Sequence, residues 1–180
     1  MAGYSMKFVW HIYVFLYILL FLGFFVWINI MHSNINVISV SALVLPTIVV
    51  IALYISQREI KYQAKHVGLV ICLSLFVGAF YQLWVHEQQS NFSYSKWSEN
   101  PKERVWMVDD LLSQYDFIGM DVLTLESILG KATDTSYFEA PRRLVYYLGD
   151  ERGLISIDSE WLTFDFNEEG FVTTVNIMRD

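Results

Sequence analysis

Three long apolar runs in the first half of the chain constrain its fold more than any other sequence feature. They cover residues 8–31, 37–56 and 67–85, and none of them contains Asp, Glu, Lys or Arg. A helix needs about 20 consecutive apolar residues to cross the hydrocarbon core of a bilayer, and all three runs approach or exceed that length. The sequence therefore predicts a three-helix membrane anchor over residues 1–86.

The first run is predicted to be a retained helix, because it is longer than the apolar part of a signal peptide and no small-residue cleavage site follows it. Pro46 lies in the middle of the second run, where membrane helices tolerate a kink. His11 is the one ionisable candidate within the runs, and its place near a helix end favours an interfacial position over a transport site.

The short loops predict the orientation of this anchor. Loop 57–66 carries Arg58, Lys61 and Lys65, whereas loop 32–36 has neither Lys nor Arg. Because positively charged loops stay on the cytoplasmic side, we expect the N-terminus in the cytoplasm and residues 87–180 outside it, at the cytoplasmic membrane.

Charge and residue type limit what the second half can do. Residues 91–180 hold eight basic and 17 acidic residues, a net charge of −9, which argues against a nucleic-acid partner. They contain no His and no Cys, so nucleophile–base pairs and the usual zinc sites are not expected. The lone Cys72 excludes a disulfide within the chain. We expect no catalytic residue, cofactor or metal site.

Residues 87–99 are polar and aperiodic, so we interpret them as a linker that precedes a folded domain over residues 100–180. Asn100, Pro101 and Glu103 have the order of a helix start. Apolar residues then recur at helical spacing up to Tyr115, which predicts a first amphipathic helix.

The stretch "GMDVLTLESILG", residues 119–130, predicts a second, short helix with defined ends. Asp121 is the expected N-cap, and Gly130 is expected to close the helix in a left-handed conformation after Leu129. Gly119 allows the turn between the helices, and Met120 is expected to be buried beside Gly130. The stretch is therefore interpreted as a folding element rather than a catalytic one.

The remainder of the chain predicts strands. Residues 143–149, 159–166 and 171–178 are aromatic or alternating, and the turn 167–170, which ends at Gly170, joins the last two into a hairpin. Residues 136–140 are a candidate for a further short strand. The predicted fold class is α+β, with three transmembrane helices followed by a small ααβββ domain with an antiparallel sheet.

Residues 118–138, the strand "LVYYLG" and the hairpin "EWLTFDFNEEGFVTTVNI" together resemble the SmpA/OmlA-like domains, of which BamE is typical. The shared layout over residues 101–178 is a Gly-Met pair, a capping residue, a helix ending in Leu-Gly, an aromatic strand and a closing hairpin. Ala132 stands where that family has Pro, and three apolar runs replace its lipidated cysteine. The resemblance implies a membrane-tethered, non-enzymatic domain of the bacterial cell envelope.

Three functions remain open from the sequence. The first is an interaction or scaffold module that the bilayer anchors and that binds an envelope or membrane protein. The second is a regulatory or sensor subunit whose helices pair with another membrane protein. The third, least favoured, is an enzyme, for which the clustered acids are Asp150, Glu151, Asp158 and Glu160, around "GDERG".

Overall fold

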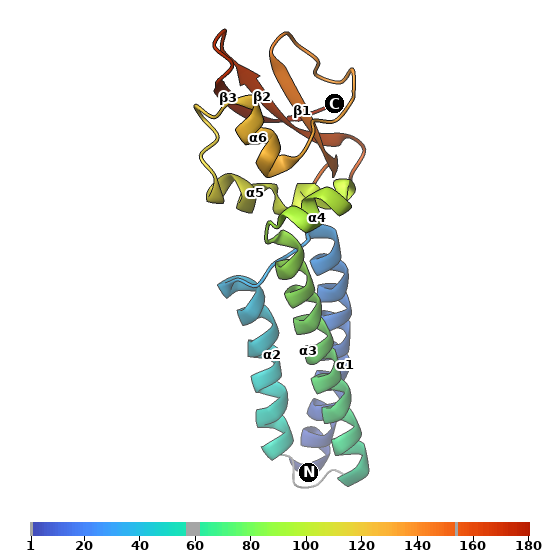
Figure 1. Cartoon of the computed structure of the whole chain (residues 1–180). Coiled ribbons are helices and arrows are strands. Elements are labelled where there is room, and N and C mark those ends of the chain that lie inside the picture. The colour runs from blue at the N-terminus through green and yellow to red at the C-terminus, as the bar shows by residue number, and fades with distance from the viewer. Residues whose placement is uncertain (1, 57–61, 154) are drawn as a thin grey trace. The chain divides into compact units, whose positions relative to one another are not determined.

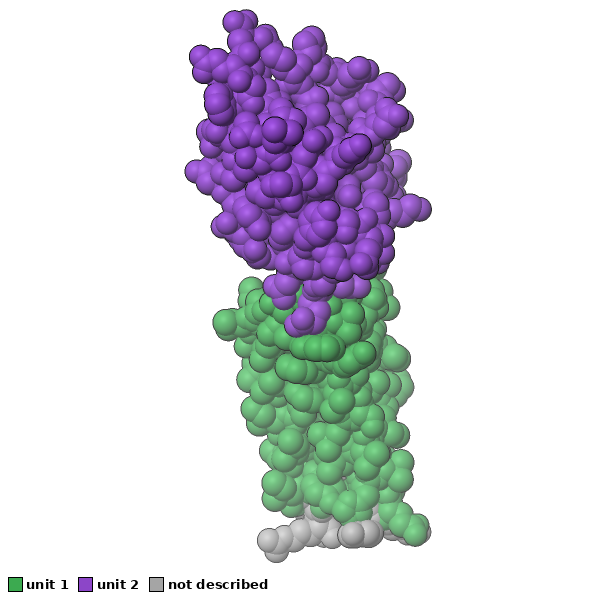
Figure 2. Space-filling view, viewed as in Figure 1, with its two compact units in different colours: residues 1–87 green, residues 88–180 purple. Residues whose placement is uncertain are grey.

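The computed structural model describes residues 2–56, 62–153 and 155–180. The chain divides into two compact units, Met1–Glu87 and Gln88–Asp180 (Figure 2). Each unit has its own core of buried apolar side chains. Figure 1 gives the order of the helices and strands along the chain.

The first unit is made of helices: α1 (Ala2–Met31), α2 (Val37–Ser56) and most of α3 (Tyr62–Ser90). Three segments are long and apolar enough to cross a membrane: Phe8–Met31, Val37–Ser56 and Gln63–Ser90. The first two coincide with the predicted runs, and the third is longer than predicted at both ends.

The three helices pack along a seam of buried residues that recur within each helix at intervals of four or seven. This spacing keeps one stripe of each helix facing its neighbours. Two glycines of α3 make room for rings of α1, since a Cβ added to Gly68 or Gly78 would lie 3.1 Å from the ring of Trp10 or Phe25, respectively. The seam consists of Trp10, Tyr17, Phe21, Ile28, Leu43, Val50, Cys72, Ala79 and Leu83.

Polar side chains also join α1 to α2. The Tyr17 hydroxyl lies 2.8 Å from Thr47 Oγ1, which donates to the Leu43 carbonyl at 2.7 Å. The Tyr13 hydroxyl donates to the carbonyl of Pro46, which lies inside α2 as predicted. Such interhelical hydrogen bonds help membrane helices to associate, because lipid offers these groups no polar partner.

The second unit has an α+β layout, as predicted. Its three strands form one antiparallel sheet in the order β1-β2-β3, and the last two form the predicted hairpin. The elements are α4 (Tyr94–Glu99), the 3₁₀ helix η1 (Pro101–Glu103), α5 (Arg104–Gln114), α6 (Val122–Leu129), β1 (Arg143–Asp150), β2 (Ser159–Phe166) and β3 (Val172–Arg179).

The helices of this unit share a core with one face of the sheet. Alternate residues of β2 point to that face because the side-chain period of a strand is two. Leu162, Phe164 and Phe166 accordingly belong to the core, as predicted. The other members include Trp97 of α4, four residues of α5, Leu125 and Leu129 of α6, and Tyr146 and Leu148 of β1.

The opposite face of the sheet carries a smaller aromatic cluster. Trp161 packs against Tyr147 of the neighbouring strand, with ring centroids 5.0 Å apart, and stacks on Tyr137 at 5.3 Å. Phe138 also contacts Trp161. Residues 136–140 therefore cover the sheet as an irregular segment, and the candidate strand predicted there does not form.

The predicted linker 87–99 is wrong, because most of this segment is folded. Its first residues continue α3, and Ser93 then caps α4. Trp97 of α4 is fully buried, and its indole N–H donates to the Leu129 carbonyl at 3.0 Å. Arg104 lies over the Trp97 ring and donates from Nε to the Trp97 carbonyl at 2.7 Å. These contacts bring residues 94–99 into the domain.

A helical turn begins at Pro101 as predicted, but it is a 3₁₀ turn, and the α-helix begins three residues later at Arg104. The Asn100 side chain makes no capping hydrogen bond. Its backbone instead ends α4, by donating to the Lys96 carbonyl, and begins η1, by accepting from the Glu103 N–H. A short 3₁₀ turn thus precedes α5.

Candidate functional site

The cap at the start of α6 forms as predicted. Asp121 Oδ1 accepts from the Thr124 backbone N–H at 2.9 Å, and Oδ2 accepts from the Thr124 hydroxyl at 2.9 Å. Hydrogen bonds from the Thr124 backbone and hydroxyl lower the pKa of the Asp121 carboxyl. The carboxylate is thus occupied by its own helix terminus, which is a structural role.

Gly130 ends α6, but its conformation differs from the prediction. Its φ is +75°, positive as expected, whereas its ψ of −170° lies outside the left-handed helical region. Backbone with these angles is essentially restricted to glycine. The Tyr146 hydroxyl donates to the Gly130 carbonyl at 2.9 Å, so the helix end is tied to β1.

Gly119 and Met120 attach this stretch to the sheet. The Gly119 N–H donates to the Val172 carbonyl at 2.8 Å, and the Val172 N–H donates to the Met120 carbonyl at 2.9 Å. Met120 is half-buried against the core, not fully buried, and it lies at the opposite end of α6 from Gly130. The expected contact of Met120 with Gly130 is therefore wrong, although the folding role of the stretch holds.

Gly170 completes the β2–β3 turn with a φ of +87°. Asn167 organises this turn, because its Oδ1 accepts from the N–H groups of Glu169 and Phe171 at 3.0 and 2.9 Å. The residues proposed as a structural motif, Gly119, Met120, Asp121, Leu129, Gly130 and Gly170, thus shape turns, helix ends and the core.

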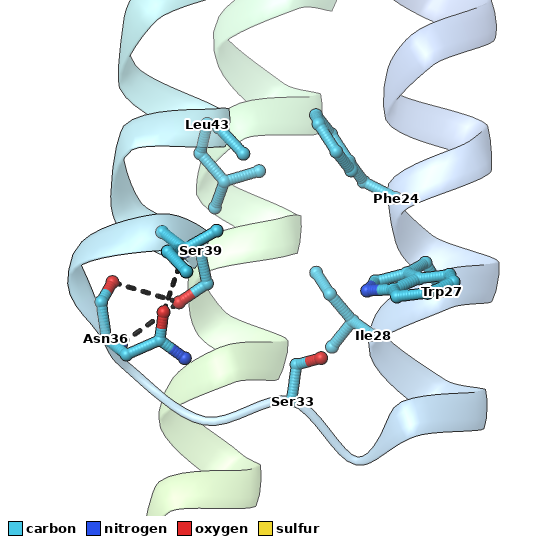
Figure 3. A pocket seen from close by; sticks show the side chains of 9 residues that line it. Phe24, Trp27, Ile28, Ser33, Asn36, Ser39 and Leu43 are labelled. Carbon is cyan, nitrogen blue, oxygen red and sulfur yellow. Dashed lines mark hydrogen bonds between the residues drawn. The ribbon is translucent and has the colours of Figure 1, made fainter. Parts of the chain in front are cut away.

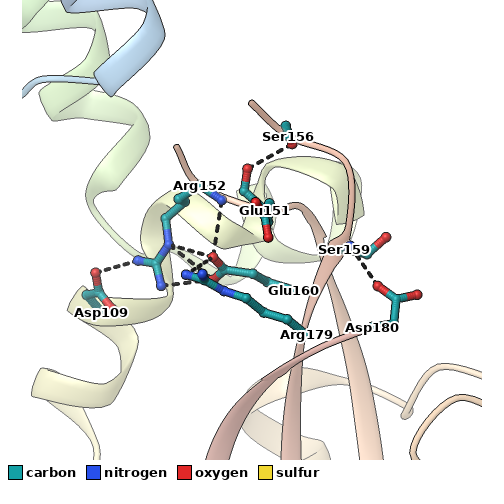
Figure 4. A network of polar contacts seen from close by, with 8 residues as sticks. All are labelled: Asp109, Glu151, Arg152, Ser156, Ser159, Glu160, Arg179 and Asp180. Carbon is teal, nitrogen blue, oxygen red and sulfur yellow. Dashed lines mark hydrogen bonds and ion pairs between the residues drawn. The ribbon is translucent and has the colours of Figure 1, made fainter. Parts of the chain in front are cut away.

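A network of charged side chains surrounds Glu160, whose side chain is fully buried (Figure 4). Glu160 Oε2 lies 2.9 Å from Arg152 Nη2, and Oε1 lies 3.1 Å from Arg179 Nη2. The Arg152 backbone N–H also donates to Oε1, and Arg152 Nη1 reaches Asp109 Oδ2 at 2.6 Å. The network joins α5, the β1–β2 loop, β2 and β3.

Two opposing effects act on the pKa of the Arg152 guanidinium. Burial lowers the pKa of its guanidinium, but hydrogen bonds and opposite charge from Glu160, together with Asp109, outweigh burial and raise the pKa overall. Arg152 therefore stays charged and balances the buried carboxylate. Both Glu160 oxygens accept hydrogen bonds from cations, so this carboxylate is arranged as a structural ion pair rather than as a general acid or base.

The other acids named for an enzyme site do not converge on Glu160. Asp150 and Asp158 are exposed, and the backbone of Glu151 accepts from the Ser156 hydroxyl. Sequence reasoning missed the arginine partners of Glu160. The signal was present, because Glu160 has the strand parity of Leu162 and Phe164, and the hairpin register places Arg179 opposite it.

The first unit contains a cavity of about 290 Å³ lined by α1, α2 and the loop between them (Figure 3). Phe24, Ile28 and Leu43 form apolar walls. Asn36 and Ser39 lie at its polar end, where they cap α2 by exchanging hydrogen bonds between their backbone N–H groups and side chains. No charged side chain lines this cavity, so it suits an apolar group rather than a reaction.

His11 and Lys65 are the other candidate functional residues of the first unit that the structure describes. His11 is exposed on α1 and lines, with Trp10, Gln63 and Gly68, a groove between α1 and α3. Lys65 lies in the first turns of α3, with its ammonium 4.2 Å from the centre of the Tyr54 ring. Arg58 and Lys61, which carry most of the predicted orientation signal, lie outside the described residues.

Within the described ranges, no group of three or more His, Cys, Asp or Glu side chains could hold a metal ion. Comparisons with protein-family models, with curated proteins and with solved structures give no match to this chain.

Proposed function

We propose that this chain is a membrane-anchored, non-enzymatic interaction module of the bacterial cell envelope. In this proposal the three apolar helices hold the chain in the cytoplasmic membrane, and the acidic domain lies outside the cytoplasm. The domain is of the SmpA/OmlA-like (BamE-like) type, and it binds a protein of the envelope or membrane. The short helix with a Gly-Met start and a Leu-Gly end, followed by an antiparallel hairpin, supports that domain type.

Three exposed apolar side chains near the start of α6 carry the proposal. Ile118, Leu123 and Phe171 are 55%, 79% and 41% exposed, and each lies within two residues of the backbone contacts that join the α6 start to β3. Neighbouring exposed apolar residues on a soluble domain mark surfaces that bind other proteins. By contrast, the buried carboxylate of Glu160 is already paired within the domain. We infer that Leu123 lies in the partner-binding surface.

Site-specific crosslinking in membranes tests this proposal. A photoreactive amino acid at position 123 of the full chain should give one discrete crosslinked product, whereas the same group at exposed Thr174 on β3 should not. With the photoreactive amino acid at position 118 instead, Leu123→Asp should abolish crosslinking to the same partner. The far-UV circular dichroism spectrum of the variant should be unchanged. Equal crosslinking from positions 123 and 174, or capture that survives Leu123→Asp, would contradict the assignment of this surface.

A second candidate function, a regulatory subunit that pairs through its helices, is favoured by one observation. Val70, Ser74, Val77 and Tyr81 line a groove along one face of α3. Ser74 is a small polar residue on that face, and such residues join membrane helices by close packing and hydrogen bonds. If this function is correct, a photoreactive group at position 77 should crosslink to the partner, and a photoreactive group at position 123 should not.

A further inference from the structure

The loop between α1 and α2 contacts α3 through a pair of histidines. The His32 and His86 rings are stacked, with centroids 4.0 Å apart and planes inclined by 7°. His86 is only 7% exposed, and its Nδ1 is buried without a hydrogen-bond partner. His32 has a φ of +43°, which residues other than glycine rarely adopt, so the loop backbone is held in an unusual conformation by its surroundings.

Two further contacts attach this loop to residues 86 and 87 of α3. The Ile35 N–H donates to Glu87 Oε2 at 3.1 Å, and the His86 ring is hydrogen-bonded to the backbone of Ser33. Loop residues 32, 33 and 35 thus all rest on residues 86 and 87. The ring stack is therefore one of three contacts that hold the loop on α3.

The surroundings of the two rings are nearly free of charge. Residues 24–43, which form the end of α1, the loop and the start of α2, contain no Asp, Glu, Lys or Arg. Residues 73–90 of α3 contain one charged side chain, Glu87, which already accepts from Ile35. A proton on either ring would therefore create a buried charge facing a second imidazole, with Glu87 as the nearest opposite charge along these segments.

We propose that His32 and His86 form a pH-sensitive contact that holds the α1–α2 loop on α3 when both rings are neutral and releases it when they are protonated. Repulsion between two cationic rings at stacking distance, in a poorly hydrated site, opposes the closed arrangement. This property goes beyond membrane anchoring, and it does not depend on which side of the membrane the loop faces.

The direction of the pH effect follows from the environment of His32. Burial, with a smaller contribution from His86, lowers the pKa of His32 to about 4. A lowered pKa means that the closed contact favours the neutral ring. The contact is therefore fully stable above about pH 6.5, the ordinary pKa of His, and it weakens as the pH falls from there toward 4.

Distance measurement between spin labels tests the proposal on the full chain in lipid nanodiscs. The labels replace Ile35, whose backbone N–H is retained, and Tyr81, which is exposed on α3, in a Cys72→Ala background. We expect one narrow distance distribution at about pH 7.5 and a second, longer population at about pH 4. An unchanged distribution at the lower pH would overturn the proposal.

Two variants assign the effect to the histidines. The double variant His32→Phe, His86→Phe keeps two stacking rings but takes up no proton, so its distance distribution should not change with pH. Glu87→Gln keeps an oxygen acceptor for the Ile35 N–H, so its transition should persist. A transition that survives in the double Phe variant, or that disappears in Glu87→Gln, would contradict the proposal.

Imidazole ¹⁵N chemical shifts of the wild-type chain, without spin labels, give a second readout. This measurement does not depend on whether any variant folds. They should report a neutral His32 well below pH 6.5, the ordinary His pKa. Full protonation of His32 near that pH would also overturn the proposal.

Discussion

Replacing Gly149 with alanine should strongly destabilise the domain, although it adds only one methyl group. Gly149 follows a bulge in β1 and has a φ of +127°. An added Cβ would lie 2.1 Å from the backbone oxygen of Lys102 in η1, and a backbone atom cannot turn away as a side chain can. Strain of about 1–2 kcal/mol at positive φ and roughly 1–3 kcal/mol from overpacking give an expected loss of about 2–5 kcal/mol.

Gly170→Ala is the matched control for this prediction. Gly170 also has a positive φ, +87°, but a Cβ there would have no atom within 4 Å, so only the backbone strain of about 1–2 kcal/mol is expected. Urea midpoints of residues 88–180 expressed alone measure both losses. Equal midpoints for the two variants would show that η1 does not pack against β1 in this way.

Replacing Glu160 with alanine should cost about 3 kcal/mol, the lower end of the range for breaking a buried ion pair. The change leaves Arg152 and Arg179 without the carboxylate that joins them. The lower end applies because the Arg179 side chain is 56% exposed and can turn toward water, and because Arg152 keeps Asp109. Glu160→Gln should cost less, since it keeps one oxygen acceptor at the same position.

Asp109→Asn is the control within the same network. The Asp109 side chain is 71% exposed, and pairs of this kind contribute about 0–1 kcal/mol in water. Urea unfolding of the three variants, with the same fragment, should rank Glu160→Ala first and Asp109→Asn last. If Glu160→Ala unfolds at the wild-type midpoint and a measurable activity is lost instead, the network is a functional site and the enzyme hypothesis gains support.

Local sequence signals predicted the elements whose formation depends on near neighbours. Asp121 caps α6 through Thr124, three residues away, and Gly130 ends the same helix with a positive φ. The β2–β3 hairpin forms where alternation and a turn ending in Gly170 predicted it. The apolar runs likewise marked the three long helices, because length and composition alone decide whether a helix can cross a membrane.

Features that depend on distant residues were not predicted. The helix at 94–99 is too short to show a period, and it is held by Trp97 and Arg104 contacts that only the tertiary fold creates. The 136–140 segment has strand-like composition, yet its aromatic rings pack on Trp161 instead of pairing as a strand. The approach of Gly149 to Lys102 and the stacking of His32 on His86 join segments more than 40 residues apart, so no local pattern encodes them.

Cysteine accessibility tests most directly whether the acidic domain lies outside the cytoplasm. In a Cys72→Ala background, a single cysteine replaces either Ser98, which is exposed in α4, or Gln57, which lies in the predicted cytoplasmic loop. Each variant is expressed in bacteria, and the cells are converted to spheroplasts. An impermeant maleimide should label position 98 in intact spheroplasts and position 57 only after permeabilisation, as the positive-inside rule requires. Labelling of position 57 but not 98 in intact spheroplasts would place the domain in the cytoplasm and contradict the proposed function.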